Sequence, residues 1–321
     1  MALITREQVG TTISKNNKKK LNTLAKKNGM KKSQVLDAAV DAFYQQTEET
    51  TIPKHKGIVI SIANNKGGVG KTTTTAAFAD LFSKRGNKVL LIDSDPQGNL
   101  SGRFGYTTDH PAKNYFGALI QDRTSNNEHQ SLTYYINHLA AFPRIDIIVS
   151  DLRLDGVYNM LASDSIASST MFRDLVEEIR AMDVYDIILI DARPALNNEV
   201  GSAFIGSDYI IIPIEAAMDS VIGANSMVQF MIKSSKLNKN LKLLGVFFNK
   251  VQDRTTSFHE LLPMVQGNWD KELFKTRIPR NQDVVNAENE GVPVTFRYPA
   301  CKASKAYAKL LDEVVERLGK N

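Results

Sequence analysis

The chain has 321 residues but a single cysteine, Cys301, and no apolar run long enough to cross a membrane. A lone cysteine excludes a disulfide within one chain and a cysteine-bound zinc or iron–sulfur cluster. A spanning helix needs about 20 consecutive apolar residues, so none is expected. The first ten residues, MALITREQVG, lack the apolar segment of a signal peptide. These absences predict a protein of the reducing cytoplasm that does not enter membranes.

The positive charge of the chain is not evenly spread. The net charge is +5, but residues 1–56 hold 11 basic and 5 acidic side chains, whereas the remainder holds 29 and 30. A basic segment on a nearly neutral body favours contact with a polyanion, most often nucleic acid. A solvated arm that only keeps the protein soluble is the alternative.

A polar stretch without an apolar period, QQTEETTIPKHKG, covers residues 45–57 and contains a proline. Such composition is typical of a linker. It predicts three parts: a small module of residues 1–47, a linker of residues 48–56, and a large domain of residues 57–321.

In the large domain, apolar β-branched runs alternate with helical patterns. Continuous apolar strands flanked by helices indicate a parallel sheet covered on both faces. The alternation predicts a doubly wound α/β domain, in which ligands bind at the carboxyl ends of the strands. The expected strands are 57–63, 88–93, 145–151, 185–191, 208–214 and 241–249.

The stretch ANNKGGVGKTTTT, residues 63–75, follows the first expected strand and opens a helical pattern. This is the context that a phosphate-binding loop requires. Backbone N–H groups in such a loop turn inward around an anion, and the helix N-terminus adds positive potential. The residues that can contribute in this way are Gly67, Gly68, Val69 and Gly70.

The residues that follow the glycines predict binding of ATP and Mg²⁺. Lys71 can reach the β- and γ-phosphates, and the hydroxyl of Thr72 can ligate Mg²⁺. Thr73 can hydrogen-bond near the α-phosphate. Catalysis in such a site is positioning and electrostatics, and the products are ADP and phosphate.

Carboxylates end two of the expected strands. In LLIDSDPQGNLS, Asp93 and Asp95 alternate with period two, which is expected to place both on one side of the extended chain. A pair of carboxylates beside a phosphate loop suits Mg²⁺ and the positioning of water. In YDIILIDARP, four apolar residues precede Asp191, which could bind Mg²⁺ through one of its waters.

Two departures from the common phosphate loop point to a particular family. The first glycine of G-x-x-x-x-G-K-[ST] is replaced by Asn65, and a second lysine, Lys66, follows it. Together with D-x-D-P-Q-G-N, this loop resembles that of the deviant Walker ATPases of the ParA/MinD class. The resemblance implies that Lys66 crosses a dimer interface to the phosphates held by the partner subunit. It therefore implies a homodimer that encloses ATP between its subunits.

The same resemblance assigns roles to the carboxylates. It implies that Asp95 positions or activates the attacking water and that Asp93 supports the Mg²⁺ shell. Asp191 resembles the acid of a Walker B strand. The family usually reads D-x-P-P there, whereas this chain has Arg193 in place of the first proline.

Further along, FFNKVQDRTT (247–256) and TRIPRNQDVVNAENEGVPV (276–294) resemble ParA segments that surround the adenine. By that match Asn249 and Pro279 would line the base site. Arg254 and Arg280 align with arginines implicated in sequence-independent DNA binding, although surface arginines in local ion pairs are equally consistent. A last helix over 302–318 is expected to pack its apolar face on the sheet, rather than on a membrane as in MinD-like proteins.

The N-terminal module has the order strand, helix, glycine, helix, which resembles a ribbon-helix-helix DNA-binding domain. Such a domain is a dimer whose paired strands enter the major groove. Thr12 and Ser14 would then face bases, and phosphates would be held by Lys15, Lys31 and Lys32. A two-helix dimerisation or partner-binding arm is the alternative.

The resemblance to ParA, which covers roughly residues 57–321, implies a DNA-partitioning ATPase that associates with the nucleoid. ATP would close the dimer, the dimer would bind DNA, and a ParB-type centromere-binding protein would stimulate hydrolysis. The N-terminal module would add binding to specific DNA, for example for autoregulation. Two alternatives remain: a MinD-like ATPase that cycles on a membrane, and a transcriptional repressor whose dimerisation is gated by ATP.

Overall fold

The computed structural model describes residues 57–106, 112–125, 128–252 and 256–319, together with positions 22, 23, 25, 32 and 35. The chain divides into two compact units, Met1–Thr51 and Ile52–Asn321. In the first unit the described positions are helical, and Ala25 and Val35 are buried. The predicted ribbon-helix-helix arrangement lies outside the described residues, and the three-part division of the chain stays a prediction.

The second unit is built on a seven-stranded sheet with the order β3-β4-β2-β5-β1-β6-β7. Every pairing is parallel except that of β3 with β4. The strands are β1 (Ile58–Ile62), β2 (Val89–Asp93), β3 (Asn137–His138), β4 (Ile145–Ile148), β5 (Ile187–Asp191), β6 (Tyr209–Ile214) and β7 (Lys242–Phe248). All six strands expected from the sequence are present, which confirms the predicted doubly wound sheet.

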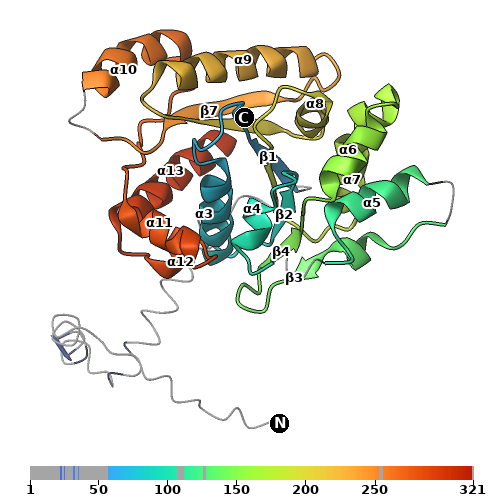
Figure 1. Cartoon of the computed structure of the whole chain (residues 1–321). Helices are drawn as coiled ribbons and strands as arrows, with labels where there is room; N and C mark the ends of the chain where they lie inside the picture. The colour runs from blue at the N-terminus through green and yellow to red at the C-terminus, as the bar shows by residue number, and fades with distance from the viewer. Residues whose placement is uncertain are drawn as a thin grey trace. The chain divides into compact units, whose positions relative to one another are not determined.

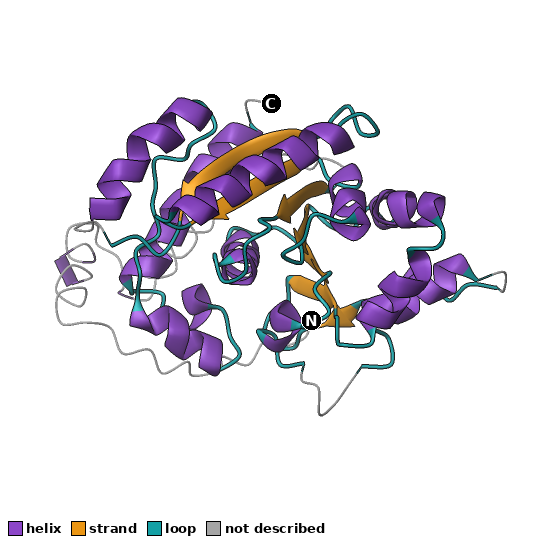
Figure 2. Cartoon of the chain, turned by 45° about the horizontal axis from the view of Figure 1, so that its top comes forward, coloured by secondary structure: helices purple, strands orange, loops and turns teal. Residues whose placement is uncertain are grey.

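Helices lie on both sides of the strands, as Figures 1 and 2 show. One side carries α3 (Lys71–Lys84), α4 (Asn99–Gly102), α11 (Gln282–Asn289), α12 (Val294–Arg297) and α13 (Lys302–Leu318). The other carries α5 (Phe116–Thr124), α6 (Leu154–Leu161), α7 (Ser165–Ala181), α8 (Asn198–Ile205), α9 (Met218–Ser234) and α10 (Thr256–Trp269). A short 3₁₀ helix, η1 (Leu132–Tyr135), precedes β3.

The central strands are mostly apolar because successive side chains enter different cores. Ile60 and Ile62 pack with Phe78 of α3 and Tyr307 of α13. Val59, the residue before Ile60, packs on the opposite face with the side chains of α5, α6 and α7. This alternation is what the pleat of a strand imposes when both faces are covered.

The last helix, α13, spans the predicted residues 302–318. Its predicted apolar face is buried, which confirms that the helix packs on the domain; that face consists of Tyr307, Leu310, Leu311, Val314 and Leu318. Within the described part of the chain, no helix has the length and apolarity needed to cross a bilayer.

Candidate nucleotide site

The loop between β1 and α3 owes its shape to two glycines in the left-handed conformation. Gly68 and Gly70 have φ angles of 78° and 93°, which glycine adopts without steric cost. A Cβ atom at Gly70 would lie 2.0 Å from the Nδ2 atom of Asn249, so this position has no room for a side chain. Because α3 begins at Lys71, the positive end of its dipole faces the loop.

Lys71 is buried beneath this loop, as a lysine that binds phosphates in its own subunit would be. Its Nζ donates a hydrogen bond to the carbonyl oxygen of Lys66 at 3.2 Å. Burial lowers the pKa of Lys71, while the charges of Asp191 and Asp95 act in the opposite direction.

Lys66 has a different environment, although it lies five residues before Lys71. Its Nζ forms an ion pair with the Oδ2 of Asp219, in the first turn of α9, at 2.9 Å. Its backbone N–H donates to Oδ1 of Asn64 at 3.0 Å. The side chain of Lys66 thus contacts α9, whereas that of Lys71 stays within the loop.

Asp93 and Asp191 end the neighbouring strands β2 and β5 and are paired in register. Both are buried. Oδ2 of Asp93 accepts hydrogen bonds from the backbone N–H and the hydroxyl of Ser101, at 2.8 and 2.7 Å. Oδ2 of Asp191 accepts one from the hydroxyl of Thr72 at 2.6 Å. The predicted metal-site residues Thr72 and Asp191 are therefore in direct contact.

Burial of two neighbouring acids makes their ionised forms unfavourable. Desolvation raises the pKa of Asp93 to about 7. Desolvation, followed by the charge of Asp93, raises the pKa of Asp191 to about 8. A divalent cation at this edge would reverse both effects, because it favours the carboxylates in their charged form.

The donor set at this edge fits Mg²⁺ bound together with a nucleotide. Oδ1 of Asp191 is buried and has no hydrogen-bond partner, so it is free to accept from a metal-bound water. Within the described residues, no group of three His, Cys, Asp or Glu side chains could hold a metal ion. Mg²⁺ is commonly held by one or two carboxylates and substrate phosphates, with several waters retained.

Asp95 lies at the same edge, but not for the reason expected from the sequence. β2 ends at Asp93, so period-two alternation does not extend to Asp95. The chain turns instead: the N–H of Asp95 donates to Oδ1 of Asp93 at 3.2 Å, and Oδ1 of Asp95 accepts from the N–H of Gln97 at 3.0 Å. The predicted side-by-side placement in one strand is wrong, because a turn that uses both carboxylates replaces the last strand residues.

A cavity of about 310 Å³ lies beside α3 and brings together Thr73, Asn249 and Pro279. Nδ2 of Asn249 donates to the carbonyl oxygen of Val69 at 2.8 Å, which joins the end of β7 to the phosphate loop. This cavity has the size and position for the base and sugar of a nucleotide whose phosphates lie in the loop. Arg280, predicted to bind DNA, also lines it and is exposed.

Two residues at this cavity were not found by sequence reasoning. Glu288 accepts a hydrogen bond from the hydroxyl of Thr73 at 2.6 Å and forms an ion pair with Arg103 at 3.2 Å. Lys250 forms an ion pair with Glu215 at 3.1 Å and donates to the carbonyl of Gly68. Both lie within the ParA-like segments 247–256 and 276–294, but nothing in those segments singles out either residue, because the fold brings them to the cavity.

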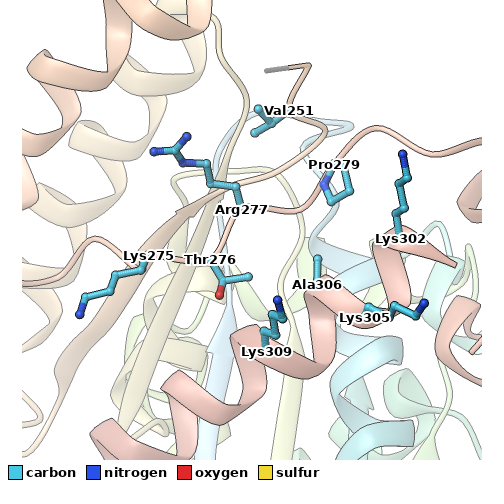
Figure 3. Close-up of a pocket in the computed structure, with 9 residues that line it drawn as sticks. All are labelled: Val251, Lys275, Thr276, Arg277, Pro279, Lys302, Lys305, Ala306 and Lys309. Atoms are coloured by element: carbon cyan, nitrogen blue, oxygen red, sulfur yellow. The ribbon is translucent and has the colours of Figure 1, made fainter. Parts of the chain in front are cut away.

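On the other side of Pro279, a hollow of about 580 Å³ is lined by cations. Figure 3 shows three lysines on α13 facing the segment that follows α10. No ion pair involves any of its cationic side chains within the residues that the structure describes. We call this the basic hollow; its cations are Lys275, Arg277, Lys302, Lys305 and Lys309.

Of the DNA-binding residues predicted in the N-terminal module, the structure describes Lys32, which is helical and exposed. The others, and one arginine of the large domain, lie outside the described residues; they are Thr12, Ser14, Lys15, Lys31 and Arg254. Their predicted role is therefore untested.

A glycine loop that opens a helix, beside two carboxylates at adjacent strand ends, defines a phosphate-loop nucleotide-binding enzyme. The family model of an AAA domain matches residues 57–243. A chromosome partitioning protein, ParA of Caulobacter vibrioides, is 30% identical and aligns over 81% of this chain and 94% of its own length. An uncharacterized protein of Methanocaldococcus jannaschii is 35% identical and aligns over 81% of this chain and 99% of its own length.

Solved structures share the fold. A Cyanothece McdA–ATP complex has a TM-score of 0.69 at 22% identity and covers 82% of this chain and 96% of its own. Pyrococcus horikoshii MinD has a TM-score of 0.64 at 23% identity and covers 80% of this chain and 96% of its own. The chain belongs to the ParA family of AAA-domain ATPases and is a partition-type ATPase.

Proposed function

We propose that this protein is a DNA-partitioning ATPase, in which ATP closes a homodimer that binds DNA on the nucleoid and a ParB-type protein stimulates hydrolysis. The main observation in support is that the side chains of the two loop lysines have different surroundings. The side chain of Lys71 stays within the loop, whereas that of Lys66 points to α9. A lysine so placed is available to a second subunit. The cargo would be a plasmid or chromosome.

In this proposal the residues of one subunit hold ATP. The loop amides and Lys71 bind the phosphates, and Asn249 and Pro279 line the site of the base. Thr72 and Asp191 would hold Mg²⁺, with Asp93 behind them, and the ion would supply positive charge to the phosphates. Asp95 orients the attacking water. The solved Pyrococcus horikoshii MinD contains Mg-ADP, which supports this choice of ligands.

The partner subunit completes the site. Its Lys66 would neutralise charge that develops on the transferred phosphoryl group. Exposed apolar side chains flank the nucleotide face near α9, among them Met218 and Ile222, which are 50% and 56% exposed. A second copy of the chain would cover such a surface in a two-fold dimer.

For DNA, the basic hollow offers five exposed cations with no acidic partner among the described residues. Contacts of this kind neutralise phosphates without reading sequence, and their affinity falls with salt. Specific DNA would be bound by residues 1–47. The buried apolar face of α13 favours this function over the membrane-cycling alternative, because no apolar face of that helix remains for lipid.

Two lysine substitutions test the dimer. We expect Lys71→Ala to lose ATP binding, measured by titration with a fluorescent ATP analogue. Lys66→Ala should keep much of that binding but lose ATP-dependent dimerisation and hydrolysis, measured by light scattering and phosphate release. Lys233→Ala, an exposed lysine in the last turn of α9, is the matched control and should behave as the wild type. Normal dimerisation and hydrolysis by Lys66→Ala would refute the proposed dimer.

DNA binding is tested separately by titration of random and native upstream DNA with ATP, with ADP and without nucleotide. Lys305→Ala and Lys309→Ala should each weaken binding to all sequences. Each should also make the fall of log affinity with log salt less steep, by about one unit of slope. Deletion of residues 1–47 should abolish only the preference for upstream DNA. ATP-dependent binding to liposomes but not to DNA would favour the MinD-like alternative. Repression without a partition defect would favour the repressor.

A further inference from the structure

The ion pair between Lys66 and Asp219 joins the phosphate loop to the first turn of α9. Nζ of Lys66 lies 2.9 Å from Oδ2 of Asp219, and the two side chains are 28% and 69% exposed. Oδ1 of Asp219 accepts the N–H of Ser220 at 2.9 Å. The helix N-terminus therefore orients the carboxylate whether or not Lys66 is bound.

Other contacts fix this turn of α9 against the loop. A Cβ atom at Gly223 would lie 2.3 Å from Oδ1 of Asn65, so helix and loop touch directly. The hydroxyl of Ser220 accepts the N–H of Glu215 at 2.9 Å. Glu215 in turn pairs with Lys250, which bonds to the loop at Gly68. Asp219 therefore stays in place when Lys66 moves.

We propose that Asp219 is a positioning residue that holds Lys66 against its own subunit until a second ATP-bound copy arrives. This inference rests on the proposed function, in which Lys66 serves the partner's ATP. One ammonium group cannot contact Asp219 and the phosphates of the other subunit together. Dimer formation therefore exchanges the ion pair with Asp219 for contact with a triphosphate, and the strength of that pair sets the protein concentration at which the dimer forms.

The exposure of the ion pair between Lys66 and Asp219 limits how far its loss can change the dimer dissociation constant. An exposed ion pair of this kind changes an equilibrium by a factor of roughly 2 to 5. A two-fold dimer releases two Lys66 side chains, one from each subunit, so the factors multiply to roughly 4 to 25 in the dimer dissociation constant. The pair is weak enough to be displaced by a triphosphate, yet its removal is measurable.

The test measures dimerisation of the full-length protein by sedimentation equilibrium with a non-hydrolysable ATP analogue. Asp219→Asn should tighten the dimer by roughly 4- to 25-fold at low salt, and the gain should shrink at about 1 M salt, where charges are screened. Asp219→Glu, which keeps the charge, should stay close to the wild type. The affinity of the monomer for the analogue should not change, because Lys71 is untouched.

Asp312→Asn is the matched control. Asp312 is 67% exposed and pairs with Arg85 at 2.5 Å, outside the nucleotide site, so its loss should leave dimerisation unchanged. A purely structural role of Asp219 in capping α9 would lower the melting temperature and would not tighten the dimer. Asp219→Ser provides a second neutral variant if the asparagine variant fails to fold.

An unchanged or weakened dimer in Asp219→Asn would overturn this inference. The Lys66→Ala variant distinguishes a failure of the proposed dimer from a failure of the proposed role of Asp219. Normal dimerisation of Lys66→Ala would refute the proposed dimer itself. Weak dimerisation of Lys66→Ala together with an unchanged Asp219→Asn would refute only the role of Asp219.

Discussion

Replacing Asp191 by asparagine should stabilise the nucleotide-free protein, although it removes a residue of the site. Asp191 is buried beside Asp93, and its Oδ1 has no hydrogen-bond partner. Burial raises its pKa from 3.8 to about 8. Because the folded state holds this proton more tightly than the unfolded chain does, stability is lost as the pH rises from the ordinary value towards 8. A neutral amide does not suffer that loss.

The magnitude follows from the size of the shift. One pKa unit corresponds to about 1.4 kcal/mol, so a rise from 3.8 to about 8 gives a ceiling of about 6 kcal/mol. About 5 kcal/mol of this is reached near pH 8, where the group is half ionised. The amide would lack one partner, which costs about 1–3 kcal/mol. We therefore expect Asp191→Asn to raise the free energy of unfolding by roughly 2–4 kcal/mol at about pH 8, and by about zero or less near pH 5.

Denaturant unfolding at both pH values, with chelator and without nucleotide, measures this difference. The melting temperature should rise by roughly 4–16 °C at about pH 8, at 2–4 °C per kcal/mol for a domain of this size. Addition of Mg-ATP should stabilise the wild type and not the variant, because the variant lacks a carboxylate at the metal site. Destabilisation of the variant by the same amount at both pH values would refute the reasoning from buried charge.

Three further substitutions test separate parts of the structure. Gly70→Ala should abolish ATP binding in a fluorescence titration, because its Cβ would lie 2.0 Å from Asn249 and its φ is 93°; retained binding would contradict the loop geometry. Arg317→Ala should lower the free energy of unfolding by about 2–4 kcal/mol, because the guanidinium bonds to three backbone carbonyls near β7; a change below about 1 kcal/mol would contradict it. Arg193→Ala should cost less than about 1 kcal/mol in denaturant unfolding, because its pair with Asp155 at 3.3 Å is partly exposed; a larger loss would show that Arg193 has more than a surface role.

The sheet could be predicted because its strands are buried on both faces and read as continuous apolar runs. α13 could be predicted because its apolar positions recur at helical spacing over 17 residues. β3 was missed, since it has two residues and pairs antiparallel at the edge beside β4. Part of its attachment is a side-chain contact between His138 and Asp146 at 2.7 Å, which no periodicity reveals.

The residues of the site also divide into those that local sequence marks and those that only the fold brings into place. Lys71, Thr72 and Asp191 could be predicted, because a local motif or a strand end marks each of them. Glu288 could not, because it reaches Thr73 across 215 residues of sequence. It lies on a short helix, and only the fold brings it to the cavity.

Two features of the site bear on how a subunit would respond to Mg-ATP. Burial raises the pKa of Asp93 to about 7 and that of Asp191 to about 8, which disfavours the ionised carboxylates. Lys66 is paired with Asp219. In the proposed dimer, Mg-ATP would favour the ionised carboxylates within one subunit, whereas contact of Lys66 with a triphosphate would require the second subunit. Hydrolysis that needs both changes should therefore rise more steeply than in proportion to protein concentration, as expected when the active species is a dimer.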